Sequence, residues 1–317
     1  MPVGRVPLWH LDWLTLGGRG HWDSRGIQWI LMDETGFWDS PDARVDVTDR
    51  SNAHGSYIGP IYYKERVITL KGRAFSDDST ALRRYWSLVT GLCADPEASY
   101  MLSCESEIGT LYCSVRRDGQ VITTPNALLN TNSFDFSVQL IAADPRKYST
   151  QRRTMRATVP SATTGDGLDF AAGTSPNVGL EFDTGTGGLV FGHQNSSGLL
   201  QLTNDGTAPT APTYELHGPL TTPTVSAWKG DRAYVMTYND TLADGEYLTL
   251  DPSEPAVLLG GTASRRWLLN PAEFGAFYIP AADPATDQPG WLSVGLTHEG
   301  AADDAGYLTA TFADAYF

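Results

Sequence analysis

Apolar and polar residues alternate along several stretches in the first half of the chain. In residues 42–49, Ala43, Val45 and Val47 alternate with charged and polar residues. A period of two places one face of a strand in water and the other in the core, so we expect this strand to be half-buried. The same reasoning predicts further strands at residues 27–31, 65–72, 99–104, 110–116 and 134–141.

Helical spacing is clear in one stretch, residues 77–92. Its apolar residues recur every three or four positions and form one stripe: Leu82, Tyr85, Trp86, Val89 and Leu92. Ser76, Asp77 and Asp78 supply N-capping oxygens, and Gly91 can take the left-handed residue that ends the helix. The order strand, helix, hairpin, strand predicts an N-terminal α+β domain, residues 1–150, in which one helix covers a sheet.

The second half of the chain has short strand patterns separated by turn residues. Residues 149–198 are polar and rich in Gly, Thr and Ser, which places a domain boundary near residues 148–159. Strands are then predicted at residues 213–217, 224–228, 233–238, 246–250, 256–259, 266–269, 277–279, 291–296 and 308–313. Many short strands with regular turns and no convincing helix predict an antiparallel β-sandwich or jelly roll over residues 151–317. The fold class is therefore mainly β.

A connector rich in Gly, Pro and Thr joins two of these strands at residues 200–219, LQLTNDGTAPTAPTYELHGP. Pro209 and Pro212 fix φ and push the residue before each toward extended geometry, which favours a stiff crossover. The motif N-x-G-T-A-P-x-x-P, a strand and then G-P resembles the opening of the C-terminal domain of siphophage distal tail proteins. Gly55-Ser56-Tyr57, residues 66–72 (RVITLKG) and residues 142–148 (AADPRKY) are similar to the N-terminal domain of the same family.

This resemblance implies a structural virion protein of the tail tip. The N-terminal domain would form a ring, a hexamer by family analogy, with strand-rich arms pairing between subunits. The ring would join the tail tube to the tail-tip hub, and a galectin-like C-terminal sandwich would face outward. Host-surface polysaccharide is a further possible partner, and the protein would be assembled in the bacterial cytoplasm.

The overall charge of −15 changes which partners are expected. Nucleic-acid binding needs clustered Lys and Arg, so we expect none; an acidic wall would let DNA pass without sticking. No apolar run approaches the ~20 residues that span a bilayer, and the N-terminus lacks the pattern of a secretory signal. We therefore expect no membrane insertion.

The three cysteines, Cys93, Cys104 and Cys113, do not suggest a disulfide framework. A tight turn centred on Ile108-Gly109 would place Cys104 directly opposite Cys113, whereas a bulged loop would shift the register by one. We expect free, partly buried thiols, and no metal site because no His lies near them.

Catalytic motifs are absent from the sequence, and we expect neither enzymatic activity nor a cofactor. The six histidines are scattered, and His217 is interpreted as a structural residue. A glycan hydrolase using carboxylates such as Glu105, Glu107, Asp244, Glu246 or Asp251 is one alternative. The other is a carbohydrate-binding module in which Trp228, Trp267 and Trp291 stack on sugar rings, although each is also a candidate core or interface anchor.

Overall fold

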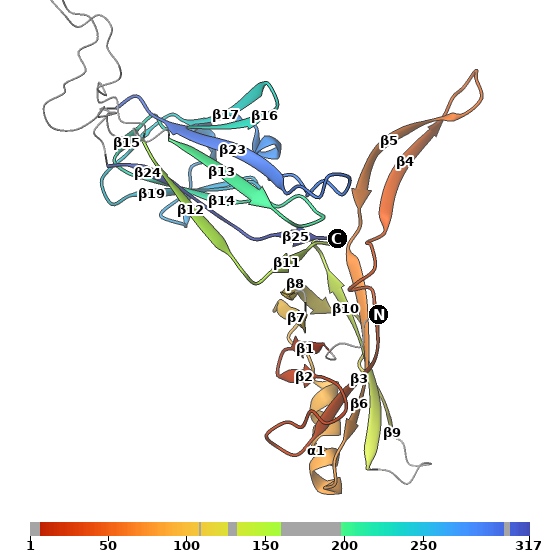
Figure 1. Ribbon diagram of the computed structural model, residues 1–317. Helices are drawn as coiled ribbons and strands as arrows, with labels where there is room; N and C mark the ends of the chain where they lie inside the picture. The colour runs from red at the N-terminus through yellow and green to blue at the C-terminus, as the bar shows by residue number, and fades with distance from the viewer. Residues whose placement is uncertain (1–6, 108, 126–131, 160–197, 301–304) are drawn as a thin grey trace, which may run out of the picture. The chain divides into compact units, whose positions relative to one another are not determined.

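A computed structural model describes residues 7–107, 109–125, 132–159, 198–300 and 305–317. The chain divides into two compact units (Figure 1). Unit 1 contains residues 1–151 and 314–317, and unit 2 contains residues 152–313. The four residues 314–317 therefore belong to the first unit, whereas the sequence analysis placed them in the second.

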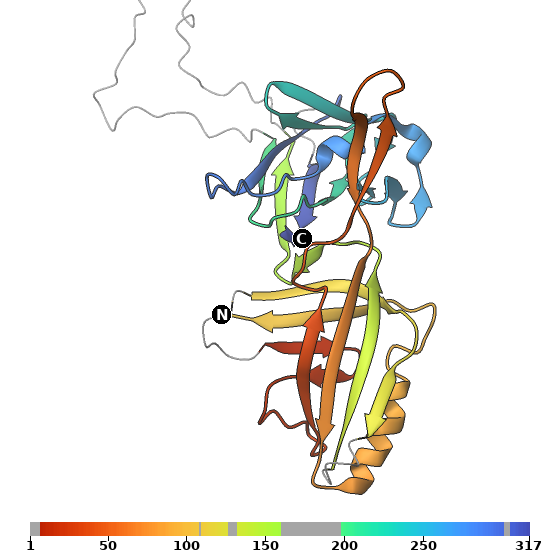
Figure 2. The same cartoon turned by 90° about the vertical axis from the view of Figure 1, so that its right-hand side faces the viewer.

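In its described residues, unit 1 is built on one ten-stranded sheet with one α-helix beside it (Figure 2). Its elements are β1 Leu8–Leu11, β2 Leu14–Leu16, β3 Gln28–Thr35, β4 Ala43–Asp49, β5 Ser56–Tyr63, β6 Arg66–Phe75, α1 Ser79–Thr90, β7 Tyr100–Ser106, β8 Gly109–Arg117, β9 Ile122–Pro125, β10 Ser133–Ala142, β11 Lys147–Ser149 and β25 Ala315–Tyr316. The strand order is β2-β1-β7-β8-β10-β6-β3, with β9 beside β10 and with β11 between β8 and β25. Strands β4 and β5 form a separate two-stranded sheet.

Helix α1 confirms the predicted apolar stripe, because Leu82, Tyr85 and Val89 are buried in the core of unit 1. Asp78 is the N-cap, and its carboxylate accepts a hydrogen bond from the Thr80 amide. The predicted left-handed Gly91 is wrong, since its φ is −91°. Among the described residues, no helix combines the length and apolar character needed to cross a membrane.

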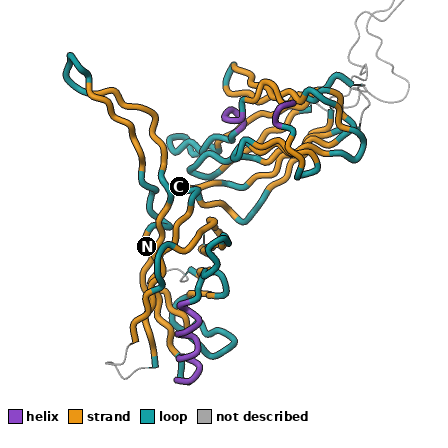
Figure 3. Tube along the Cα trace, turned by 180° about the vertical axis from the view of Figure 1, so that it is seen from behind, coloured by secondary structure: helices purple, strands orange, loops and turns teal. Residues whose placement is uncertain are grey.

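The described part of unit 2 is mostly strands (Figure 3), arranged in two larger antiparallel sheets and a separate two-stranded sheet. Buried side chains of the two larger sheets belong to one hydrophobic core. The elements of unit 2 are β12 Arg153–Thr158, β13 Leu199–Asn204, β14 Thr213–His217, β15 Leu220–Thr221, β16 Thr224–Lys229, β17 Arg232–Tyr238, β18 Thr241–Leu242, β19 Tyr247–Asp251, β20 Ala256–Leu259, β21 Ala263–Ser264, η2 Arg266–Leu268, β22 Leu269–Ala272, η3 Phe274–Phe277, β23 Gly290–Thr297 and β24 Tyr307–Phe312. The six-stranded sheet has the order β12-β24-β14-β19-β20-β21, and the five-stranded sheet has the order β13-β23-β16-β17-β22. The mainly β fold with one α-helix is confirmed.

Two predicted strands of unit 2 are wrong. Residues 266–268 form the 3₁₀ helix η2, and Phe277 ends the 3₁₀ helix η3. Ile279 makes only an isolated bridge, to Thr210. Short apolar runs such as these do not distinguish a strand from a helical turn that packs on the core. The polar segment 160–197, for which no role was predicted, lies outside the described residues.

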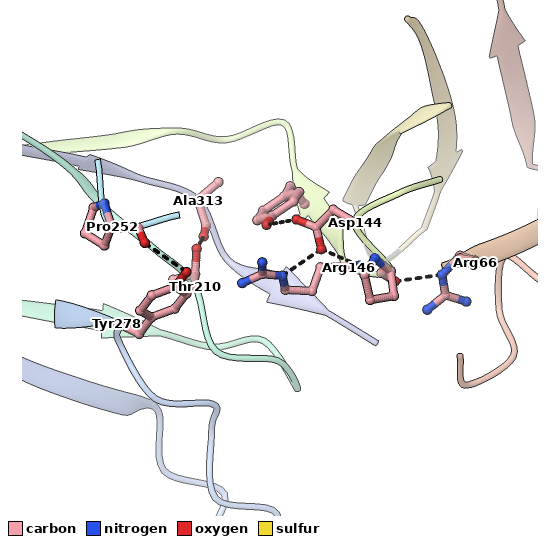
Figure 4. A network of polar contacts seen from close by, with 9 residues as sticks. Arg66, Asp144, Arg146, Thr210, Pro252, Tyr278 and Ala313 are labelled. Carbon is pink, nitrogen blue, oxygen red and sulfur yellow. Dashed lines mark hydrogen bonds and ion pairs between the residues drawn. The ribbon is translucent and has the colours of Figure 1, made fainter. Parts of the chain in front are cut away.

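The connector motif has a physical explanation in side-chain hydrogen bonds. The Asn204 side chain is fully buried; its amide donates to the carbonyls of Ala208 (2.8 Å) and Pro280 (2.9 Å), and its oxygen accepts from the Gly206 amide (3.0 Å). The Thr210 hydroxyl donates to the carbonyl of Ala313, as Figure 4 shows. The polar residues of the motif thus satisfy backbone groups along a chain segment that has few ladder bonds of its own.

Candidate functional site

The β4–β5 hairpin is the most unusual surface of unit 1. In register, Ala43 faces Tyr63, Val45 faces Ile61 and Val47 faces Ile58. Within the described residues these two strands pair only with each other, and the hairpin extends away from the ten-stranded sheet (Figure 3). Every residue of β4 is exposed, so the prediction of a half-buried strand is wrong. The alternation is present, but its apolar face has no core to cover.

One face of the hairpin is aliphatic. Along β4 alternate residues share a face, so Val45 and Val47 lie together with their cross-strand partners Ile61 and Ile58. We call these four residues the aliphatic face. Ile58 is 72% exposed and Ile61 is 61% exposed. The register of the hairpin shifts by one residue between Val45 and Val47, opposite Gly59 and Pro60, and proline is tolerated there because it need not donate to the ladder.

The opposite face of the hairpin carries arginine–tyrosine contacts. The Arg44 guanidinium lies 6.0 Å from the centroid of the Tyr62 ring, and that of Arg50 lies 5.0 Å from the Tyr57 ring. Tyr57 is 65% exposed. Stacked cations and tyrosines of this kind are common anchors in protein interfaces.

Two buried cations fix the root of the hairpin. Arg66, only 2% exposed, donates through Nη1 to the carbonyls of Gly36 (2.6 Å), Phe37 and Asp39. Lys147 is equally buried, and its Nζ donates to the Phe37 carbonyl at 2.8 Å. Because these carbonyls belong to the segment between β3 and β4, the two cations hold the chain where it enters the hairpin.

The AADPRKY motif supplies the other side of this root. The Asp144 carboxylate accepts hydrogen bonds from the Arg146 side chain at 2.8 Å and from the Tyr148 hydroxyl at 2.6 Å (Figure 4). The carbonyl of Pro145 accepts from Arg66 Nε at 2.8 Å. The motif therefore orders a turn that presents one carbonyl and one lysine to the hairpin root.

The electrostatics of the root reflect its burial. Burial, followed by the nearby Arg66 charge, lowers the pKa of Lys147 to about 8. Burial likewise raises the pKa of Glu34, whose carboxylate accepts from the Phe37 amide at 2.6 Å. Sequence reasoning missed Arg66 and Lys147 as structural residues. Arg66 is nevertheless two residues before Ile68 and four before Leu70, so its side chain lies on the same, core-facing side of β6. This spacing is the sequence signal that could have identified Arg66 as buried.

Trp228 and Trp291, two of the proposed sugar-stacking residues, lie on the outer face of the five-stranded sheet. Trp228 pairs across the ladder with Ser293, so Trp291 is its diagonal neighbour on the same face. A Cβ at Gly295 would lie 2.9 Å from the Trp228 ring, which shows that the indole covers this glycine. Trp291 is 53% exposed. Trp267, 69% exposed, belongs instead to η2, where Arg265 lies over its ring at 5.7 Å.

The carboxylates considered for hydrolysis make local contacts. Glu105 pairs with His10 at 3.0 Å, Glu246 accepts from the Ala243 amide, and Asp251 accepts from Ser253. His217 stacks on Tyr307 at 4.4 Å between centroids, as a structural residue would. In the part of the chain that the structure describes, no cluster of three or more His, Cys, Asp or Glu residues could hold a metal ion.

The cysteines are free and fully buried. Cys104 faces Leu111 and Cys113 faces Leu102, so neither expected register is right. The ladder closes at Ser106 and Gly109, which centres the turn one residue earlier than expected. Burial is the main cause that raises the pKa of each thiol to about 12.

Comparisons with known proteins bear on the fold. No family model and no curated protein matches the chain. The structure is similar to the crystal structure of the Dit protein (gp 19.1) of phage SPP1, described as a paradigm of the hub adsorption apparatus in phages that infect Gram-positive bacteria; the TM-score is 0.63 at 11% identity, over 99% of this chain and 100% of that chain. A chain of the phage P2 baseplate in its activated conformation with Ca gives 0.45 at 9% identity, over 96% of this chain and 98% of that chain. The resemblance to distal tail proteins is confirmed at the level of the fold.

Proposed function

We propose that this chain is a structural protein of a phage tail tip, in which copies of unit 1 assemble into a ring, a hexamer by analogy, between the tail tube and the hub. The β4–β5 hairpin is the single observation that carries the proposal. The fold shared over the full length with a hub protein of SPP1 supplies the context.

The hairpin needs a partner on physical grounds. An isolated two-stranded hairpin is marginally stable in water, and contiguous exposed apolar residues mark an interaction surface. The aliphatic face and the three tyrosines Tyr57, Tyr62 and Tyr63 remain exposed within the single chain. In a head-to-tail contact each copy receives the hairpin of one neighbour, so every hairpin is covered when the ring closes. A closed ring also leaves no strand edge open to uncontrolled aggregation.

The proposal is tested by the double variant Ile58→Asp, Ile61→Asp. Two charges on the aliphatic face should abolish self-association, measured by sedimentation velocity and by electron microscopy of the particles. Met101→Asp is the matched control, because Met101 is also 58% exposed but lies on β7. A wild-type protein that stays monomeric at high concentration, without ring-shaped particles, would contradict the proposal.

A second candidate function, recognition of host-surface glycan, is favoured by Trp228 and Trp291. The edge of the half-buried Trp228 ring lies over Gly295, and its neighbour Trp291 is 53% exposed, so the two indoles offer aromatic surface on which a sugar ring could stack. Cell-wall polysaccharide should quench Trp fluorescence in the wild type and in Trp267→Ala but not in Trp228→Ala. Equal quenching in all three proteins would speak against this site.

A further inference from the structure

The outer face of the unit 1 sheet contains a hollow of about 220 Å³ where β3, β6, β9 and β10 lie side by side. Its lining includes Met32, Lys71, Gly72, Ile122, Asp135 and Phe136. At ~30 Å³ per water molecule the space equals roughly seven waters. That is enough for a branched or aromatic side chain from another protein.

Local sequence explains why the sheet is hollowed here. The ladder between β3 and β6 shifts at Met32, so this side chain stands out of register beside the hollow and is 54% exposed. Gly72 pairs with Phe136, whose ring packs in the core 2.4 Å from the position of a Gly72 Cβ, so these two residues place no side chain on the outer face. Ile122, on β9, forms the opposite wall and is also 54% exposed.

The charged residues around the hollow are paired with one another. Lys71 Nζ lies 2.9 Å from the Asp33 carboxylate, and Arg73 makes two hydrogen bonds to Asp135, at 2.6 and 2.9 Å. The hollow therefore has two apolar walls, Met32 and Ile122, and the charged side chains around it already have ion-pair partners. Such a surface suits an uncharged apolar occupant, because an ionic one would lose hydration without gaining a free counter-charge.

We propose that this hollow receives the aliphatic face of the β4–β5 hairpin from a second copy of the chain. The inference rests on the proposed self-assembly and names the surface that receives the hairpin. The aliphatic face matches it in chemistry, since Val45, Val47, Ile58 and Ile61 are uncharged and exposed, and Ile58 is the most exposed of them. No described hairpin residue lines the hollow of its own chain, so each copy carries one unsatisfied surface of each kind. Two different complementary patches on one chain give a heterologous contact, which generates a ring when the rotation between neighbouring copies closes.

Disulfide trapping tests the contact directly. The double variant Ile58→Cys, Met32→Cys should give, under mild oxidation, a ladder of covalent oligomers on a denaturing gel. The native cysteines contribute little background, because all three are buried and burial raises their thiol pKa to about 12. Ile58→Cys, Met101→Cys is the matched control, since Met101 is similarly exposed on β7. A second variant, Ile122→Asp, should weaken self-association at least about tenfold, as expected for a charge in the centre of an apolar contact.

The outcomes separate this inference from the broader proposal. A ladder specific to the Met32 pair, together with weaker assembly of Ile122→Asp, supports the hollow as the receptor. Assembly that depends on Ile58 and Ile61 but yields equal cross-linking in both pairs, or that is indifferent to Ile122→Asp, overturns the inference and leaves the ring proposal intact. A wild-type chain that never self-associates overturns both.

Discussion

At the scale of single residues, the two buried cations at the hairpin root are bound mainly by carbonyl oxygens. Arg66 and Lys147 together donate to the carbonyls of Gly36, Phe37, Asp39 and Pro145. A buried charge is tolerated when several dipoles replace its hydration. The lowered pKa of Lys147 shows that the replacement is incomplete for the lysine.

Because the pKa of Lys147 is lowered in the folded protein, its contribution to the free energy of unfolding should rise with pH over a narrow window. Its pKa is about 8 in the folded protein against an ordinary value of 10.5, so between these values the unfolded chain binds more protons and the free energy of unfolding increases with pH. The thiols act in the opposite direction above pH 9, because their folded pKa values are raised to about 12. Between pH 7.5 and pH 9 the free energy of urea unfolding of the wild type should therefore rise relative to that of Lys147→Met, which keeps the thiol effect and lacks the ammonium. The same pH slope in both proteins would contradict this account.

Gly218, in the G-P end of the connector motif, is predicted to tolerate no side chain. A Cβ at this position would lie 2.0 Å from the carbonyl oxygen of Ala243, and backbone cannot move aside as a flexible side chain can. Gly218→Ala should reduce the free energy of unfolding of unit 2 by about 2–3 kcal/mol, as overpacking does. Gly275→Ala is the control, since no atom lies within 4 Å of its Cβ position. Equal urea midpoints for the two variants would refute the close approach.

At the scale of elements, the sequence patterns predicted the helix and the strands whose apolar side chains lie in a hydrophobic core. Helix α1 and strands such as β14 and β20 have the expected apolar positions because each covers one core face. The β4–β5 hairpin is an element whose sequence pattern did not predict its exposure to solvent. The alternation in β4 is the same whether its apolar side faces a core or another copy, so a period of two cannot report burial. The hollow on the sheet was equally inaccessible to prediction, because it depends on a register shift at Met32 and on strands that are distant in sequence.

Shortening the hairpin should leave unit 1 folded and remove only the proposed self-association. None of the residues between Val45 and Ile61 belongs to the core of unit 1. Replacing residues 45–61 by Asn-Gly keeps the Arg44–Tyr62 pair beside a two-residue turn that suits an antiparallel hairpin. Thermal unfolding should shift by no more than a few degrees, while sedimentation should show monomers. A large loss of thermal stability would mean that the hairpin supports the unit from which it extends.

At the scale of the whole molecule, the chain leaves unit 1 after residue 151 and returns to it at residue 314. Strand β25 pairs with β11, which also pairs with β8, and Ala315 is fully buried. Phe317 lies against Tyr63 at the base of the hairpin, with 4.3 Å between the ring centroids. The last residues thus complete a sheet whose other strands come from the first half of the sequence. No local pattern in so short a segment could have assigned it to that sheet.

Removal of residues 315–317 should therefore destabilise unit 1 selectively. The deletion removes the β25 ladder and exposes β11, and we expect a loss of about 1–3 kcal/mol, typical of losing a buried strand contact. Calorimetry should show the unit 1 transition at a lower temperature and the unit 2 transition unchanged, because the core of unit 2 contains none of the deleted residues. Phe317→Ala is the matched control, since it removes the Tyr63 contact and keeps the β11–β25 pairs, and it should cause a smaller shift. A deletion that lowers only the unit 2 transition would show that these residues stabilise the sandwich, and it would refute the assignment of this strand to unit 1.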